Sequence, residues 1–297
     1  MSNTHRNTIF VDEGQVLAQF AWPGEQFVTR LRAPKTAANA LPGSFAHITC
    51  DPELPMRRPL SIMRVDATEG WIDVLYKIVG QGLLQLSRRR VGDPVSVLGP
   101  IGKPFALDPK RPKALLIGGG VGIPPMVFLA EAHRHESKAV WDPLVLMGSE
   151  IPFPFETSAS NIKVAGIDPA ASHTIDELEA QGIATRLASA SGIEGCFDGY
   201  VTDLAAQWLA SLSTSERAAV CIYACGPTPM LEAAARVAQR FDVPAQVSLE
   251  EYMACAVGGC AGCTVPVYDG DTVAMKRVCV DGPVFDASAV FPPAQSA

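Results

Sequence analysis

The stretch "ALLIGGGVGIPPMVFLAEAHRH" (114–135) decides the fold, because one strand, one turn and one helix follow each other within it. Its apolar start is typical of a buried strand, and its end has the composition of a helix. Pro124 and Pro125 fit the first turn of that helix, where no amide donor is needed. The glycines between strand and helix let the backbone approach a pyrophosphate: Gly118, Gly119, Gly120 and Gly122. The stretch therefore predicts a nucleotide-binding α/β unit, with a plain tight turn as the alternative.

Further strands and helices follow this unit along the chain. The segments "DPLVLMGS" (142–149) and "AAVCIYACGP" (218–227) have the composition of buried strands, and "TPMLEAAARVAQRF" (228–241) that of a helix. Strands that alternate with helices indicate a parallel sheet. Such sheets bind ligands at the edge formed by the carboxyl ends of their strands, where we expect three residues: Cys225, Gly226 and Pro227. For Cys225, a small buried thiol without a direct role is an equally good interpretation.

The N-terminal third of the chain has a different texture, with short β segments separated by turns. The segments "QFVTRLRA" (26–33) and "GWIDVLYKIV" (70–79) are rich in β-branched and aromatic residues. The turn-forming clusters "WPG", "LPGS" and "VGDP" lie between the β segments. Many short strands at this spacing predict an antiparallel β-barrel. The stretch "LDPKRPK" (107–113), rich in proline and charge, suits a linker between the barrel and the α/β unit.

Two segments of the predicted barrel contain candidate ligand contacts. In "RRPLSI" (57–62), Arg58 can pair with a phosphate and Ser61 can offer a hydroxyl, although the segment also suits an ordinary junction of turn and strand. The segment "YKIVGQGLLQL" (76–86) places two glycines ahead of an expected helix: Gly80 and Gly82. Its first residue, Tyr76, is either a ligand contact or an aromatic residue that faces the core.

Four cysteines near the C-terminal end have the pattern C-x4-C-x2-C-x15-C: Cys255, Cys260, Cys263 and Cys279. This is the plant-type spacing of [2Fe–2S] proteins, in which three of the four thiolates come from one wrapping loop. Such a loop needs small residues that bring backbone N–H groups to the cluster sulfurs, and it contains Ala256, Gly258, Gly259, Ala261 and Gly262. The main alternative is a zinc site, which more often shows two C-x2-C pairs, whereas this segment has one.

The overall composition limits the class of protein. With 297 residues the chain is long enough for two cores, and its net charge of −7 argues against binding to nucleic acid. No apolar run reaches the roughly eighteen residues of a membrane span, and "MSNTHRNTIFVDEG" (1–14) lacks the features of a secretory signal. We therefore expect a cytoplasmic protein that binds neither nucleic acid nor membrane, with cysteines that are reduced or ligate metal.

The expected architecture combines an antiparallel β-barrel, a Rossmann-like parallel α/β domain and a cluster-binding region. Helices are expected to stop near residue 244, where the cysteine-rich segment begins. The expected ranges are the barrel (1–107), the α/β domain (108–243), the cluster region (244–290) and a tail (291–297).

Taken in this order, the segments resemble the electron-transfer subunit of class 1B dihydroorotate dehydrogenase, a ferredoxin reductase-like flavoprotein. The resemblance covers nearly the whole chain and rests on "RPLS", "YKIVGQG", "GPIGKPF", "IGGGVGIPPM", "CGPTPML" and the cysteine pattern. It implies FAD between the barrel and the α/β domain, NAD(H) at the α/β domain and one [2Fe–2S] cluster. The FAD contacts that it implies are Arg58, Pro59, Leu60, Ser61, Leu75, Tyr76, Lys77, Gly82 and Leu83. Gly118, Gly119, Gly120, Gly122, Cys225, Gly226 and Pro227 would face the nicotinamide nucleotide, and no side chain is expected to be catalytic, since the cofactors carry the chemistry.

The resemblance also implies a partner. An FMN-containing catalytic subunit would oxidise dihydroorotate to orotate in pyrimidine biosynthesis, and electrons would pass through the cluster and FAD to NAD+, in a heterotetramer. We expect the cluster loop (256–262) to face this subunit, because its small apolar residues suit close approach. Glu150, after the second α/β strand, predicts a preference for NADH, since a carboxylate repels a 2′-phosphate.

Two departures from the family pattern leave other partners open. Leu83 stands where the family usually has threonine, and the stretch 148–175 is unlike the compact loop expected there. A reductase subunit that serves a hydrogenase, a glutamate synthase-like protein or a ferredoxin is the first alternative. A non-catalytic protein that senses redox state through its cluster is the second.

Overall fold

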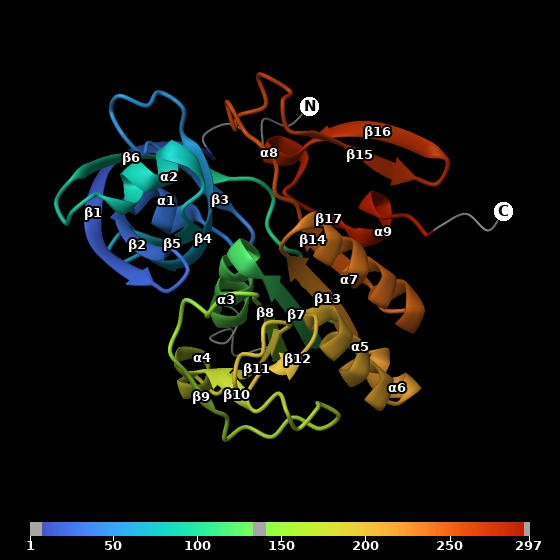
Figure 1. Ribbon diagram of the computed structural model, residues 1–297. Coiled ribbons are helices and arrows are strands. Elements are labelled where there is room, and N and C mark those ends of the chain that lie inside the picture. Colours follow the sequence, from blue (N-terminus) through green and yellow to red (C-terminus); the bar gives the residue numbers. More distant parts are fainter. Residues whose placement is uncertain (1–7, 133–140, 294–297) are drawn as a thin grey trace.

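The computed structural model describes residues 8–132 and 141–293, which form a β-barrel, an α/β unit and a cysteine-rich segment (Figure 1). In the described chain, six antiparallel strands close the barrel in the order β1-β2-β5-β4-β3-β6. Their bounds are β1 (Phe10–Trp22), β2 (Gln26–Arg32), β3 (Phe45–Ile48), β4 (Arg58–Asp66), β5 (Trp71–Lys77) and β6 (Pro94–Ile101). Two short helices lie between these strands in the chain: α1 (Pro34–Asn39) follows β2, and α2 (Gly80–Ser87) follows β5. The predicted barrel is therefore confirmed.

Alternate apolar side chains of these strands fill the barrel. On β5, for example, Ile72 and Val74 are fully buried and point to the same face. β1 has a bulge between Val16 and Ala18, so that its first part pairs with β6 and its second part with β2. The result is a closed scaffold that holds β4, β5 and α2 beside one another.

A second sheet in the described chain has seven strands in the order β12-β11-β8-β7-β13-β14-β17. All neighbouring strands are parallel except the last pair. Their bounds are β7 (Lys113–Gly119), β8 (Asp142–Gly148), β11 (Ala184–Ser189), β12 (Phe197–Asp198), β13 (Val220–Cys225), β14 (Ala245–Ser248) and β17 (Val284–Asp286). Because β7 is flanked by β8 on one side and by the later β13 on the other, the strand order reverses beside β7. In open α/β sheets, ligands bind at such a switch point.

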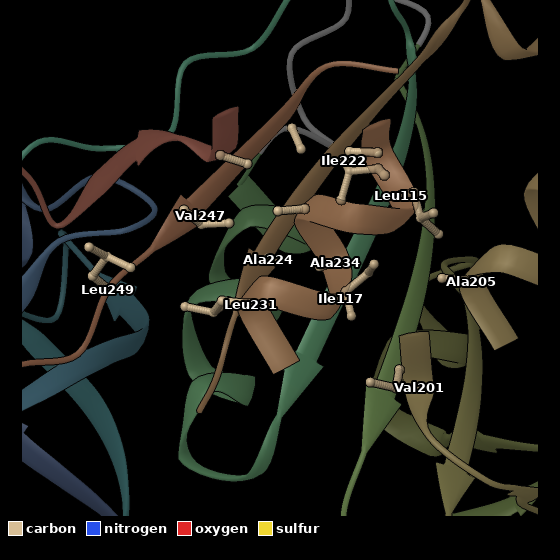
Figure 2. Close-up of a cluster of buried hydrophobic side chains, with 14 of the residues drawn as sticks. Leu115, Ile117, Val201, Ala205, Ile222, Ala224, Leu231, Ala234, Val247 and Leu249 are labelled. Carbon is tan, nitrogen blue, oxygen red and sulfur yellow. The ribbon is translucent and has the colours of Figure 1, made fainter. Parts of the chain in front are cut away.

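Helices cover both faces of this sheet. The 3₁₀ turn η1 (Gly120–Gly122) and helix α3 (Ile123–Ala132) follow β7, and α3 packs toward the barrel. The opposite face is covered by α5 (Val201–Ser211) and α7 (Thr228–Phe241), with the short α6 (Thr214–Arg217) between them in the chain. Figure 2 shows how the apolar residues of three strands meet these helices: Leu115, Ile117, Ile222, Ala224 and Val247 against Val201, Ala205, Leu231 and Ala234. The predicted helix 123–135 is described up to Ala132, and its last three residues lie outside the described ranges. No helix in the described ranges has the length and apolar character to cross a membrane.

The long segment after β8 contains the hairpin β9 (Thr157–Ala159) and β10 (His173–Ile175), followed by α4 (Asp176–Ala180). Its first part reaches the barrel, where the Gln26 side-chain amide donates to the Pro152 carbonyl oxygen at 2.8 Å. Phe153 and Phe155 are buried in the core beneath α3. The segment that departs from the family pattern is thus a packed connection between the two units.

The C-terminal part contains the hairpin β15 (Thr264–Asp269) and β16 (Thr272–Arg277), and the short helices α8 (Val278–Asp281) and α9 (Ala287–Val290). The expectation that helices stop near residue 244 is therefore wrong. β14 and β17 also extend the α/β sheet past the predicted boundary at 243, because the apolar side chains of Ala245 and Val247 pack against the core under α7. The cysteine-rich segment is consequently an insertion between two neighbouring strands of that sheet.

One half-buried charge cluster joins the barrel to the α/β unit. Nε of Arg64, on β4, lies 3.0 Å from both carboxylate oxygens of Glu131 on α3. A terminal nitrogen of the same guanidinium lies 2.7 Å from Glu177 on α4, and Gln181 donates to Glu131 at 3.0 Å. The side chains of Arg64 and Glu131 are each only 18% exposed. The two units that supply the predicted binding residues are thus held in a fixed relation.

Candidate functional site

A positively charged position lies where β4 meets the start of α2. A methyl group at Gly82 would come within 2.7 Å of Nε of Arg58, so the guanidinium lies directly against the first turn of the helix. The side chain of Val79, at the N-cap, accepts no hydrogen bond, which leaves amide donors of this turn free. Arg58 donates to the Met56 carbonyl at 2.8 Å, and no carboxylate of the described chain forms an ion pair with it. A positive charge and free amides together suit the pyrophosphate of FAD.

The other predicted FAD residues divide between ligand-facing and core positions. Pro59 and Ser61 are half-buried and share one face of β4, whereas Leu60 points into the barrel core. Leu75 is buried in the core between the barrel and α3, and Lys77 is half-buried at the end of β5. Gly80 and Gly82 lie within the first turn of α2 rather than ahead of it, and the apolar Leu83 packs against the barrel core.

Tyr76 belongs to the barrel core, which was the alternative interpretation of this residue. Its ring is 1% exposed and stacks on Phe27 at 5.7 Å between centroids. Its hydroxyl donates to Oε1 of Gln19 at 3.3 Å and accepts from Thr29 at 3.4 Å. Burial raises the pKa of the phenol, so this group stays neutral. Only the backbone of Tyr76 is available to a ligand outside the barrel.

The glycine-rich turn and the Cys-Gly-Pro segment meet at one edge of the sheet, as predicted. Gly118 pairs with Cys225 in the parallel register of β7 and β13. A methyl group at Gly122 would lie 2.3 Å from the Cys225 carbonyl oxygen, so the close approach of these two segments requires glycine. Gly120 differs from its neighbours: its φ is +54° and a methyl group there would meet nothing within 4 Å. Gly120 therefore faces open space at the switch point, where the nucleotide is expected.

Cys225 ends its strand beside two polar residues that the sequence reasoning missed. Its thiol is fully buried, and burial, followed by the charge of Glu250, raises its pKa well above the ordinary value. Ser248 pairs with Cys225 in the register of β13 and β14. Glu250 keeps solvent-exposed surface, yet the protein packed around its carboxylate raises its pKa by desolvation. A neutral thiol, a hydroxyl and a carboxyl group at this edge suit orientation of a nicotinamide ring. The signal that could have found Glu250 is the pair of acidic residues that begins two positions after β14.

The second α/β strand places Glu150 at the same edge of the sheet. Gly119 pairs with Gly148 in the register of β7 and β8, and the exposed Glu150 follows two residues later. Ser191 donates to the Glu150 carbonyl at 2.8 Å, which fixes the backbone there. The guanidinium of Arg186, on the neighbouring strand β11, is buried and donates to Ser160, Ile162 and Thr185. It is therefore engaged and not free to bind a phosphate at this edge.

The four cysteines of the C-terminal pattern lie on one tight loop and on α8. The loop turns sharply at three residues with left-handed backbone: Ala256, Gly258 and Ala261 have φ of 57°, 81° and 54°. The sulfur atoms of Cys263 and Cys279 are 3.3 Å apart and buried. Arg277 donates to the Gly258 carbonyl at 3.0 Å and holds the loop against α8. The β15–β16 hairpin thus separates Cys263 from Cys279 in the chain and returns Cys279 to the loop.

Backbone amides of this loop point at cysteine sulfur. The Cys260 N–H donates to Cys255 sulfur and the Gly262 N–H to Cys260 sulfur, each at 3.4 Å. Desolvation would raise the pKa of the Cys255 thiol, but N–H groups of Cys260, Val257 and Gly259 outweigh it and lower this pKa to about 6. Burial and the neighbouring Cys263 raise the pKa of Cys279 to about 12.

The thiols of Cys263 and Cys279 form a buried pair, whereas Cys255 is partly exposed and Cys260 is exposed. Among the described residues, no three histidine, cysteine, aspartate or glutamate side chains form a ready site for a single ion. Three thiols and sulfur-directed amides on one loop, with a fourth thiol on α8, are the donor set of a [2Fe–2S] cluster, so the residues present fit that group.

Comparison with known proteins agrees with this arrangement. Residues 250–291 match the family described as the iron–sulfur cluster binding domain of dihydroorotate dehydrogenase B. The electron transfer subunit of dihydroorotate dehydrogenase B (NAD(+)) from Bacillus caldolyticus is 36% identical, over 84% of this chain and 86% of its own. The subunit of the same name from Desulforamulus reducens is 31% identical, over 93% and 96%.

Solved structures share the fold. One reported for the NADH-dependent reduced ferredoxin–NADP oxidoreductase superposes with a TM-score of 0.75 and 26% identity, over 94% of this chain and 90% of its own. The ferredoxin reductase of carbazole 1,9a-dioxygenase superposes with a TM-score of 0.61 at 22% identity, over 80% and 67%.

Proposed function

The chain belongs to the electron-transfer subunits of NAD-dependent dihydroorotate dehydrogenase B, and from this premise we propose how its residues serve electron transfer. The single observation that carries the proposal is the position of the cysteine-rich segment. It leaves the α/β sheet at β14, directly after Ser248, and returns at β17. A cluster on Cys255, Cys260, Cys263 and Cys279 would therefore lie beside the edge where FAD and nicotinamide are expected.

The resident groups would be FAD and one [2Fe–2S] cluster, whereas NAD is a substrate and not a resident cofactor. When bound, FAD exchanges electron pairs with a nicotinamide and single electrons with a [2Fe–2S] cluster. Arg58 and the free amides of α2 would hold the FAD pyrophosphate, and Ser61 would offer its hydroxyl to the flavin. Gly120 would let the NAD pyrophosphate approach the backbone, and Glu150 would accept from the adenosine ribose.

One barrel strand connects the two cofactor sites. His47 on β3 pairs with Pro59 on β4, next to Arg58 and Ser61. His47 also lies against the backbone of Met253, and Met253 belongs to the same hydrophobic core as Phe45 of this strand. The residues that lead into the cluster loop are thus fixed on the strand beside the FAD contacts. This arrangement supports direct electron exchange between the two groups, because the protein sets the separation of its cofactors.

The partner would be an FMN-containing catalytic subunit that oxidises dihydroorotate, in a complex with two copies of each subunit in the cytoplasm. Cys260, Ala261 and Gly262 are exposed, so the cluster loop has an open side. We place the contact with the catalytic subunit on that loop. Ala261→Glu should leave NADH-dependent reduction of a small dye intact and sharply slow electron exchange with the catalytic subunit. An unchanged exchange rate would place the contact elsewhere.

The decisive experiment combines the purified chain with its catalytic subunit and follows orotate and NADH formation from dihydroorotate and NAD+. The chain should contain flavin and about two iron and two sulfide. Cys255→Ser should lose iron, sulfide and the coupled reaction, yet keep FAD and dye reduction, because the barrel holds the flavin. Zinc without sulfide would overturn the cluster. Coupling to ferredoxin but not to dihydroorotate would favour a reductase subunit with another partner, and absence of flavin would favour a redox sensor.

A further inference from the structure

The hairpin of β15 and β16 carries an exposed face whose outer part is apolar, whereas Thr264 and Arg277 lie on the same face at the base of the hairpin. In its register, Pro266 lies opposite Met275 and Tyr268 opposite Val273, so these four side chains share one face. Met275 is 62% exposed, Val273 54% and Tyr268 38%, and Pro266 is also exposed. We call these four residues the outer face of the hairpin. Antiparallel strands with one face on a core normally place polar residues on the other face.

The opposite face of the hairpin packs against the rest of the chain. Val265 is buried and Val267 half-buried in the core of the α/β unit, and β15 contacts α9. In the described chain these two strands pair only with each other. A two-stranded sheet is marginally stable in water, and it gains stability when a second layer covers it. Within residues 8–132 and 141–293 nothing covers the apolar outer face, so binding of another molecule would remove it from water.

The position of the hairpin connects this face with the cluster loop. Cys263 directly precedes β15, and Cys279 follows β16 by two residues. Figure 1 shows the hairpin and the loop at the same end of the molecule, beyond the barrel and the α/β unit. Val257 on the loop and Val280 on α8 are 51% and 39% exposed, so apolar surface occurs at the base of the hairpin as well. A protein that approaches the open side of the loop meets the hairpin too.

We propose that the catalytic subunit covers the outer face of the hairpin, in one interface that is continuous with the cluster loop. This inference rests on the proposed function. The four residues of the outer face are uncharged, and Asp269 and Asp271 lie at its tip. At its base lies Arg277, which is already engaged by the Gly258 carbonyl and by Asp281. The matching surface is therefore an apolar patch with a basic rim at the tip. A second copy of this chain is a poorer occupant, because a symmetric contact here would bring two cluster loops together and exclude the catalytic subunit from both.

The test is Val273→Glu in the full chain loaded with FAD and cluster, mixed with the purified catalytic subunit. A carboxylate in the middle of an apolar interface should weaken association, measured by sedimentation velocity, by about 30-fold or more. Val91→Glu is the matched control, because Val91 is 69% exposed on the barrel. It should associate like the unmodified chain. Iron, sulfide and dye reduction should stay unchanged in both variants, since neither residue contacts a cofactor site. Equal association of Val273→Glu and the unmodified chain would overturn the inference.

A second measurement keeps the inference testable if Val273→Glu fails to fold. Amide hydrogen exchange of residues 264–277 in the unmodified chain should slow at least about 10-fold when the catalytic subunit is added, because the face is then covered. Unchanged exchange in a formed complex would overturn the inference and leave the proposed function standing. A dimer of the chain alone that Val273→Glu dissociates would assign the face to a second copy. If the unmodified chain does not bind the catalytic subunit, the proposed function fails as well.

Discussion

Replacing Arg64 by methionine removes the charge that joins the barrel to the α/β unit and keeps most of the apolar stem of the side chain. The change leaves the Glu131 carboxylate buried without its cationic partner. Breaking a buried ion pair in this way typically costs about 3–5 kcal/mol. The side chains of Arg64 and Glu131 are each 18% exposed, and Glu131 keeps the hydrogen bond from Gln181 at 3.0 Å. We therefore expect a smaller loss, about 2–4 kcal/mol in the free energy of unfolding.

The second contact of Arg64 provides the matched control. Glu177 is 61% exposed, and its distance to Arg64 is 2.7 Å. An exposed partner of this kind contributes at most about 1 kcal/mol, so Glu177→Gln should change stability little. The assay is urea unfolding of the loaded chain followed by tryptophan fluorescence and by flavin release. For Arg64→Met, the expected loss corresponds to a melting temperature lower by roughly 5–10 °C.

Two results would refute this reasoning. If Arg64→Met unfolds at the urea concentration of the unmodified chain, the buried pair does not join the two units. If Arg64→Met and Glu177→Gln lose the same stability, burial does not distinguish the two contacts. A further readout is the rate of NADH-dependent dye reduction, which should fall in Arg64→Met even when FAD stays bound. The reason is that α3, which carries Glu131, begins at the glycine-rich turn of the nucleotide edge.

Three further predictions follow from single residues. His47 is 1% exposed, and burial, with the charge of Arg57, lowers its pKa from 6.5 to about 4, so the unfolded state binds more protons between these values. The free energy of unfolding should thus fall as the pH drops through this window. In urea titrations at pH 4 and pH 7, the difference between the two values should be smaller in His47→Gln by up to roughly 3 kcal/mol. An equal drop in the free energy of unfolding in the variant and the unmodified chain would contradict this role of His47. Gly122→Ala should cost about 1–3 kcal/mol in the same titration, because its methyl group would meet the Cys225 carbonyl at 2.3 Å, and an unchanged midpoint would exclude this close approach. NADH should reduce the flavin faster than NADPH because Glu150 repels a 2′-phosphate, and equal stopped-flow rates would remove this role.

Local patterns in the sequence were sufficient to predict the helices and strands that have strong hydrophobic periodicity. The alternation in 70–79 predicted β5, and the strand, glycine and proline order of 114–132 predicted β7, η1 and α3. The spacing of the cysteines predicted one binding loop, since three of the four ligands are local. In each case the signal lies within about twenty residues, and the physical cause of the structure is equally local.

The features that the sequence did not reveal depend on contacts between distant residues. Ser248 and Glu250 reach Cys225 only because β14 pairs with β13, and β14 is four residues long with no strong periodicity. For Tyr76 the sequence left a ligand contact and a core position open, because the face of a strand that enters a barrel depends on register with β2. The ion pair of Arg64 with Glu131 spans two domains, and no pattern of either segment predicts it.

The insertion of the cysteine-rich segment between β14 and β17 has a consequence for how such a protein is assembled in evolution. Ser248 pairs with Val284, and the Leu249 N–H donates to the Pro283 carbonyl at 3.0 Å, so both ends of the segment lie one strand spacing apart. A short turn could bridge that gap. A segment of different size could therefore be accommodated here without changing the register of β14 with β17, provided that it replaces the core contacts of Met253 and Val265. A reductase with this fold could thus gain, lose or replace the segment that binds its one-electron carrier through one insertion or deletion.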